Sequence, residues 1–263
     1  MDTDSNKIIS PLEFGQQYWT SGRLTTLDLN YNENTVVPPQ CNFRLDSITP
    51  LIGGLDKLKK LELKDNQIKA IPSSIGNLLN LDRLILESNL LTIFNEYMGN
   101  LVDLEILRIN DNQINSIPYS IGNMTSLEEV WLQNNKISSL PEEIGDLNNL
   151  ITLLLNDNLL ESIPESIGDL DNLLSLNISN NSLSSIPNTI CNIYPNLNLF
   201  STNKNIICDS LSIPNCLDDD LGEQVCSYCL PNEFLIEGYC ADTLDYQILQ
   251  NFLNMNPESQ SLG

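Results

Sequence analysis

The chain has 263 residues, with 12 Lys and Arg against 35 Asp and Glu, a formal net charge of −23 and no histidine. The absence of histidine excludes Ser-His-Asp and Cys-His nucleophile pairs and any His-ligated zinc site. The charge opposes contact with phosphate backbones, so we expect no nucleic-acid partner.

The N-terminal segment, residues 1–23, is predicted to be a lead-in or cap before the first regular element. It is acidic and lacks the apolar run of a signal peptide. No stretch of 18 or more apolar residues occurs anywhere, so the sequence predicts no membrane span in this chain. We expect either a cytosolic protein or a mature, trimmed form.

A 23-residue repeat dominates residues 24–207. One phrase begins at each of six leucines: Leu58, Leu81, Leu104, Leu127, Leu150 and Leu173. A further copy starts one residue late at Leu197, and a partial copy starts at Leu24. The unit between Leu24 and Leu58 keeps only the second half of the phrase. Fixed periods of this length indicate a solenoid, here of about eight coils with the second degenerate.

Each phrase predicts one short strand and one turn. Leu61 and Leu63 alternate with Glu62, so both leucines face inward and the glutamate faces outward. The prolines after the strand, such as Pro72, predict extended backbone and no immediate helix, and the glycines, such as Gly76, predict a tight bend or a positive φ. A buried asparagine after each strand is predicted to satisfy backbone groups of two coils. These ladder residues are Asn66, Asn89, Asn112, Asn135, Asn158 and Asn181.

The outward strand positions place an apolar strip near the middle of the arc. Exposed aliphatic and aromatic side chains ringed by Arg and polar groups are typical of an interface hot spot, although a single exposed Trp can also be without function. We expect a protein or peptide ligand on the outward face of the strands, anchored by Trp131 with Arg108 and Leu154. The predicted partner-binding residues are Trp131, Arg108, Ile85, Leu154, Ile106, Glu129 and Gln133.

The run LxxLxLxxNxLxxIPxxIGxL resembles a leucine-rich repeat. The resemblance implies a curved α/β-type horseshoe with a parallel concave sheet, a mostly irregular convex side, and a role in binding and not in catalysis. The strict 23-residue period is similar to that of intracellular Ras-group repeat proteins. The Ile-Pro dipeptide of the repeat, together with Trp19 before the first repeat, resembles the sequence of plant-type receptor ectodomains.

Residues 208–243 are predicted to form a small cysteine-rich cap. The spacing of Cys208 and Cys216 resembles the C-terminal cap of plant-type extracellular repeat proteins. Two or three disulfides are expected there, with a Cys₄ zinc site as a weaker alternative. Cys191 is interpreted as a buried thiol or as a partner of a cap cysteine. The disulfide candidates are Cys208, Cys216, Cys226, Cys229, Cys240 and Cys191.

Three glycosylation sequons begin at Asn123, Asn177 and Asn180. The tail, residues 244–263, is predicted to form a short amphipathic helix and then to be disordered. No acid/base pair or phosphate-binding loop stands out, so we expect a non-enzyme without cofactor or bound metal. The favoured interpretation is an extracellular or cell-surface recognition domain, from a receptor or a secreted binder. The alternative is a cytoplasmic Ras-group scaffold or signalling regulator.

Overall fold

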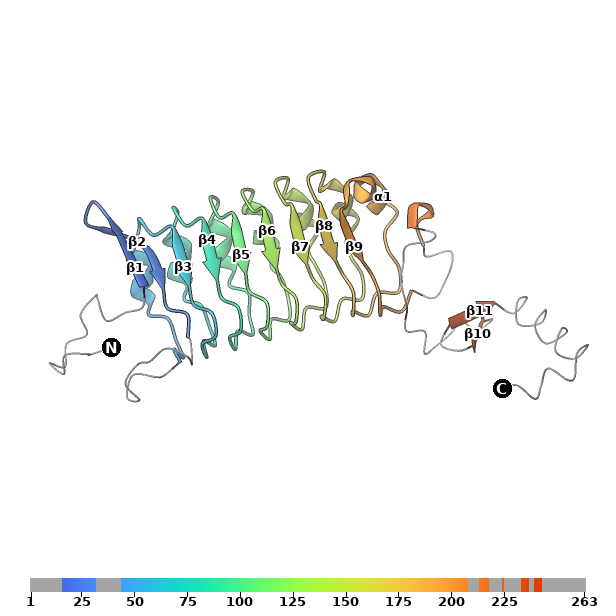
Figure 1. Cartoon of the computed structure of the whole chain (residues 1–263), viewed down its shortest axis with the longest axis horizontal. Helices are drawn as coiled ribbons and strands as arrows, with labels where there is room; N and C mark the ends of the chain where they lie inside the picture. The colour runs from blue at the N-terminus through green and yellow to red at the C-terminus, as the bar shows by residue number, and fades with distance from the viewer. Residues whose placement is uncertain are drawn as a thin grey trace, which may run out of the picture.

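The structure is a computed structural model that describes residues 16–31, 44–207, 213–217, 224, 233–236 and 239–242. Nine strands form one sheet in the order of the sequence (Figure 1). They are β1 (Gln16–Thr20), β2 (Arg23–Asp28), β3 (Lys60–Glu62), β4 (Arg83–Ile85), β5 (Ile106–Arg108), β6 (Glu129–Trp131), β7 (Thr152–Leu154), β8 (Ser175–Asn177) and β9 (Leu199–Ser201). β1 is antiparallel to β2, and every later pair is parallel.

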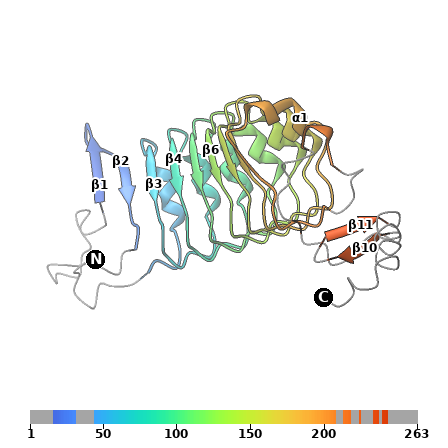
Figure 2. The same ribbon diagram turned by 45° about the vertical axis from the view of Figure 1, so that its right-hand side comes forward.

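The sheet lines one face of a curved solenoid (Figure 2), which confirms the predicted architecture. Equivalent residues of successive coils stand side by side, so that Leu61 pairs with Leu84 and Leu84 pairs with Leu107. These leucines are fully buried, and together with the other repeat leucines and isoleucines they form one continuous core along the solenoid. No coil can bury its apolar residues alone, so the stacking of neighbours is the source of stability.

Short 3-10 helices cover the opposite face, each connected to the strands by irregular chain. Those of the first six coils are η3 (Pro50–Gly54), η4 (Ser73–Asn77), η5 (Glu96–Asn100), η6 (Tyr119–Asn123), η7 (Glu142–Asp146) and η8 (Glu165–Asp169). The next coil has a four-residue α-helix, α1 (Ile190–Ile193), followed by η9 (Tyr194–Asn196). The repeat proline does not prevent a helix. Pro141, with extended backbone (ψ 155°), is the N-cap of η7, and the helix begins at the next residue.

The degenerate unit before Leu58 is not a coil of its own. β2 pairs directly with β3, with Thr26 opposite Lys60, so no strand lies between them. The unit supplies η3 to the first coil. Gly53 of η3 lies against Ser74 of the next coil, in the same way as the repeat glycine Gly76 lies against Tyr97 of the coil after that. It lacks the two alternating leucines that specify a strand, which explains why only its helical half matches the repeat.

The asparagine ladder links each coil to its neighbours. Asn112 Oδ1 accepts the Leu91 N–H (2.9 Å), while Nδ2 donates to Leu86 O (3.0 Å) and Ile109 O (3.1 Å). The other five predicted ladder residues make the same pattern, and Asn205 extends it by one coil. The amide thus satisfies buried backbone groups of two coils at once.

The repeat glycines serve close packing and not a left-handed turn. Outside the β1–β2 turn, the left-handed residues among those described are the ones before the ladder asparagines, among them Asp65, Asp111 and Asn134 (φ 55–60°). A Cβ at Gly145 would lie 2.6 Å from the carbonyl oxygen of Ser166 in the next coil. The glycine is therefore required because the helices of adjacent coils approach each other closely.

The C-terminal end of the solenoid is covered by η11 (Asn215–Leu217). Leu217 is fully buried in the core, and Cys216 forms a disulfide with Cys191. Cys191 occupies the position of the repeat glycine. The other repeat glycines pack against the helix of the next coil. Cys191 instead packs against η11, to which the disulfide links it.

Beyond η11, β10 (Glu233–Ile236) and β11 (Tyr239–Asp242) form a two-stranded antiparallel hairpin. Cys208, Cys226 and Cys229, and the predicted tail helix of residues 244–263, lie outside the described residues, and Cys240 is described only as backbone of β11. Within the described ranges, no helix is both long and apolar enough to cross a bilayer.

Candidate functional site

The concave face carries two outward columns of side chains across the strands. In one column, Arg108 of β5 pairs with Trp131 of β6, which pairs with Leu154 of β7. In the other, Ile106 pairs with Glu129. Residues opposite one another on paired strands contact laterally, so the structure brings five of the predicted site residues together in three adjacent coils.

Arg108 and Trp131 form the centre of this cluster. The Arg108 guanidinium carbon lies 3.8 Å from the centroid of the Trp131 ring, and Arg108 Nη2 lies 3.0 Å from Glu129 Oε2. A guanidinium stacked on indole and paired with a carboxylate is held in one orientation. The cluster is therefore pre-organised, and its Trp and Arg are residue types that dominate binding energies at interfaces.

The predicted apolar strip is less exposed than the sequence pattern indicated. Ile85 is only 6% exposed, which removes it as a contact residue, and Ile106, Trp131 and Leu154 are half-buried. Ile85 stands between Glu62 and Arg108 in register, and the long stems of such side chains cover apolar neighbours. The sequence could place Ile85 on the outer face but could not show this cover.

Polar atoms without a partner lie on the coils of β4, β5 and β6. Among the described residues, five buried side-chain atoms of the concave face make no hydrogen bond: Arg83 Nε, Arg108 Nε, Asn110 Oδ1, Trp131 Nε1 and Gln133 Oε1. Three are donors and two are acceptors. Buried polar groups are normally satisfied, and each of these atoms is enclosed by its neighbours, so a ligand or a water molecule can reach it only after side chains move.

The N-terminal part of the concave face holds further charge pairs. Lys64 Nζ lies 2.6 Å from Glu87 Oε1 on the adjacent coil, and this hydrogen bond raises the pKa of Lys64. Lys60 and Arg83 pair in register on β3 and β4. The concave surface is thus more basic towards β3 and more neutral and apolar towards β7.

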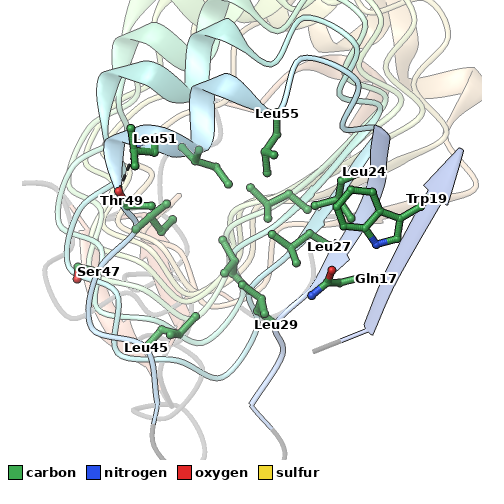
Figure 3. Close-up of a pocket in the computed structure, with 14 residues that line it drawn as sticks. Gln17, Trp19, Leu24, Leu27, Leu29, Leu45, Ser47, Thr49, Leu51 and Leu55 are labelled. Atoms are coloured by element: carbon green, nitrogen blue, oxygen red, sulfur yellow. Dashed lines mark hydrogen bonds between the residues drawn. The ribbon is translucent and has the colours of Figure 1, made fainter. Parts of the chain in front are cut away.

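An apolar hollow of about 410 Å³ lies at the N-terminal end of the solenoid (Figure 3). Trp19 of β1, Leu27 and Leu29 face Leu45 and Leu51 across it. A stacked solenoid exposes the core of its first coil unless a cap covers it. The hollow is therefore the end of the core itself, and the predicted cap, residues 1–23, is described only from Gln16 onward.

The sequon asparagines differ in their surroundings. Asn123 is exposed at the end of η6. Asn177 lies half-buried on β8, and its Oδ1 accepts the Ser179 hydroxyl (2.7 Å), while the exposed Asn180 donates to Asp157. The described residues include no group of three or more His, Cys, Asp or Glu side chains arranged to hold a metal ion.

Family comparisons identify the repeat. A family model described as Leucine Rich repeats (2 copies) matches residues 102–147, and one described as Leucine Rich Repeat matches residues 57–78 and 172–193. None of the curated protein sequences compared with the chain matches it.

Solved structures share the fold. A leucine-rich-repeat protein of Leptospira interrogans is 29% identical, with a TM-score of 0.52, over 70% of this chain and 55% of that one. The ectodomain of the Arabidopsis thaliana membrane receptor kinase GASSHO1/SCHENGEN3, in complex with CASPARIAN STRIP INTEGRITY FACTOR 2, is 29% identical, with a TM-score of 0.53, over 70% and 24%. The plant peptide hormone receptor RGFR1, in complex with RGF2, is 32% identical, with a TM-score of 0.58, over 68% and 30%.

The chain thus spans about half the length of the bacterial protein and less than a third of each plant receptor. The chain is a leucine-rich-repeat protein.

Proposed function

We propose that the chain is a non-catalytic recognition domain that binds a protein or peptide on the concave face, over strands β5 to β7. The observation that carries this proposal is the Arg108–Trp131–Glu129 cluster, in which the part-exposed Arg108 is held in one orientation by its stacking on Trp131 and its ion pair with Glu129. Two of the similar structures are complexes of plant receptors: the membrane receptor kinase GASSHO1/SCHENGEN3 with CASPARIAN STRIP INTEGRITY FACTOR 2, and the peptide hormone receptor RGFR1 with RGF2.

An extended peptide fits the chemistry of this surface. Its carbonyl oxygens can accept from the part-exposed Arg108 guanidinium, and its N–H groups can donate to the part-exposed Glu129 carboxylate. A side chain of the ligand can at the same time cover the half-buried Leu154 and Ile106. No step of this account requires a general base, a nucleophile or a cofactor.

Replacing Trp131 by alanine is expected to weaken ligand binding by about 2 kcal/mol, or about 30-fold, because the anchor and its stacked arginine are both lost. The measurement is the affinity of peptides selected from a random dodecapeptide library against the full chain. Thermal unfolding should change little, because Trp131 lies on the outer face of its strand. If every selected peptide bound Trp131→Ala as tightly as it binds wild type, the proposal would be contradicted.

We also propose an extracellular or cell-surface location. The Cys191–Cys216 disulfide supports it, because disulfides persist in oxidising compartments and are rare in the cytosol. The seven cysteines can form at most three disulfides, which leaves one thiol. We therefore expect about one free thiol when the natively produced protein is titrated in denaturant without reductant. Seven free thiols would instead favour the alternative, a cytoplasmic Ras-group protein. The strict 23-residue period is the observation that supports that alternative.

A further inference from the structure

One coil departs from the repeat on the side of the 3-10 helices. Residues 94–99 read FNEYMG where residues 71–76 read IPSSIG, and the preceding residue is Ile93. The positions equivalent to Ile93 in the other coils are small: Ala70, Ser116, Ser139, Ser162 and Ser185.

The fold does not require these exposed changes. Phe94 and Met98 fill the same buried positions as the isoleucines of other coils. Asn95 replaces the N-cap proline, accepting the Tyr97 N–H (2.9 Å) and donating to Ile71 O (2.6 Å), and η5 keeps the five-residue length of its neighbours. Ile93 and the Tyr97 ring therefore have no evident structural role.

Three large apolar side chains are exposed there around a hollow. Ile93 is 69% exposed, Tyr97 49%, and Tyr119 of the next helix 68%. Ile93 and Tyr97 line a hollow of about 450 Å³ that extends from Lys69 to Pro118, the residue before Tyr119. Single exposed apolar residues are ordinary, whereas three beside a hollow mark an interaction site. We call Ile93, Tyr97 and Tyr119 the helix-side patch.

The surface beside the patch is acidic. Glu96 of η5 and Lys69 line the hollow, η6 carries no charge, and η7 and η8 contain five carboxylates and no Lys or Arg: Glu142, Glu143, Asp146, Glu165 and Asp169. An acidic surface close to an apolar patch favours partners of opposite charge and accelerates their association.

The chain itself does not supply such a partner. Residues 208–263 carry ten Asp and Glu and no Lys or Arg, and residues 1–15 carry one Lys against three acids. A second copy would bring the same net charge of −23. Charge repulsion therefore disfavours binding of the chain's own terminal segments, or of a second copy of the chain, to this patch.

We propose that the helix-side patch is a second interaction surface, separate from the concave face, for a protein segment in which an aliphatic or aromatic side chain is flanked by Lys or Arg. The apolar side chain enters the hollow between Ile93 and Tyr97. The basic residues lie along the acidic helices towards η8. This surface does not depend on the concave site, and both can be occupied at once.

The test is selection of a random dodecapeptide library against the full chain, in parallel with a variant that carries Ile93→Ser, Tyr97→Ser and Tyr119→Glu. Each new residue type already stands at the equivalent position of another coil, so the variant is expected to fold normally, as its unfolding curve will show. Leu159→Gln is the matched control: Leu159 is 52% exposed and its equivalent is Gln113, but it lies outside the patch.

We expect wild type, Leu159→Gln and Trp131→Ala to enrich peptides that combine an apolar residue with Lys or Arg, and the triple variant to bind these at least about tenfold more weakly. Their affinity should fall as salt is raised. Enrichment of patch-dependent peptides without positive charge would overturn the proposed chemistry. If no enriched peptide depends on the patch, the surface itself is refuted, whatever the outcome for Trp131.

Discussion

Replacing Asn112 by leucine is expected to lower the free energy of unfolding by about 3 kcal/mol, because the buried Leu91 N–H loses its acceptor and three carbonyls lose a donor. Two of these carbonyls retain another ladder donor, since Asn89 donates to Leu86 O and Asn135 to Ile109 O. The orphaned N–H is therefore the main cost. The loss should be measured by urea unfolding of the full chain.

Gln113→Leu is the control for this experiment. Gln113 follows the ladder position, and leucine already stands at the equivalent positions Leu90 and Leu159. Its side chain accepts only an exposed hydrogen bond from Lys136, so we expect a change within about 0.5 kcal/mol. Equal stability of Asn112→Leu and Gln113→Leu would show that the ladder does not hold the coils together.

Replacing Gly145 by alanine is expected to destabilise the solenoid by about 2 to 3 kcal/mol, because its Cβ meets backbone that cannot move independently. The new atom would lie 2.6 Å from Ser166 O and 2.7 Å from Ser166 Cβ. Relief requires the η7 and η8 helices to separate, which loosens the core beneath them. Thermal unfolding monitored by circular dichroism measures the loss.

Gly54→Ala tests whether crowding, and not loss of glycine flexibility, is the cause. A Cβ at Gly54 would meet no atom within 4 Å. Alanine also reduces the freedom of the unfolded chain, so we expect this variant to be as stable as wild type or slightly more stable. A comparable loss at both positions would contradict the close-packing account of the repeat glycines.

The sequence predicted the solenoid well because its determinants are local and periodic. The alternating leucines specify strand, face and register, and the ladder asparagines identify the position where buried backbone needs partners. The left-handed residues were also visible in principle, since Asp, Asn and Ser at positions such as Asp65 and Asn134 tolerate positive φ.

Features that depend on the neighbouring coil could not be predicted in this way. The need for Gly145 arises from Ser166, and the low exposure of Ile85 does not follow from its own outward strand position. Similarly, only the three-dimensional arrangement shows that Arg108 stacks on Trp131 while it pairs with Glu129. The departure at Ile93 and Tyr97 was present in the sequence, but its meaning depends on their exposure beside a hollow.

The central claim, recognition on the concave face, is tested most directly by photo-cross-linking the unbiased pool of selected peptides to the full chain and locating the adducts by mass spectrometry. We predict that, beside any adducts at the helix-side patch, a distinct set of adducts falls on β5 and β6 and the residues that follow them, around Arg108, Trp131 and Gln133. Adducts confined to the helices, to the ends of the solenoid or to the C-terminal segment would contradict the claim.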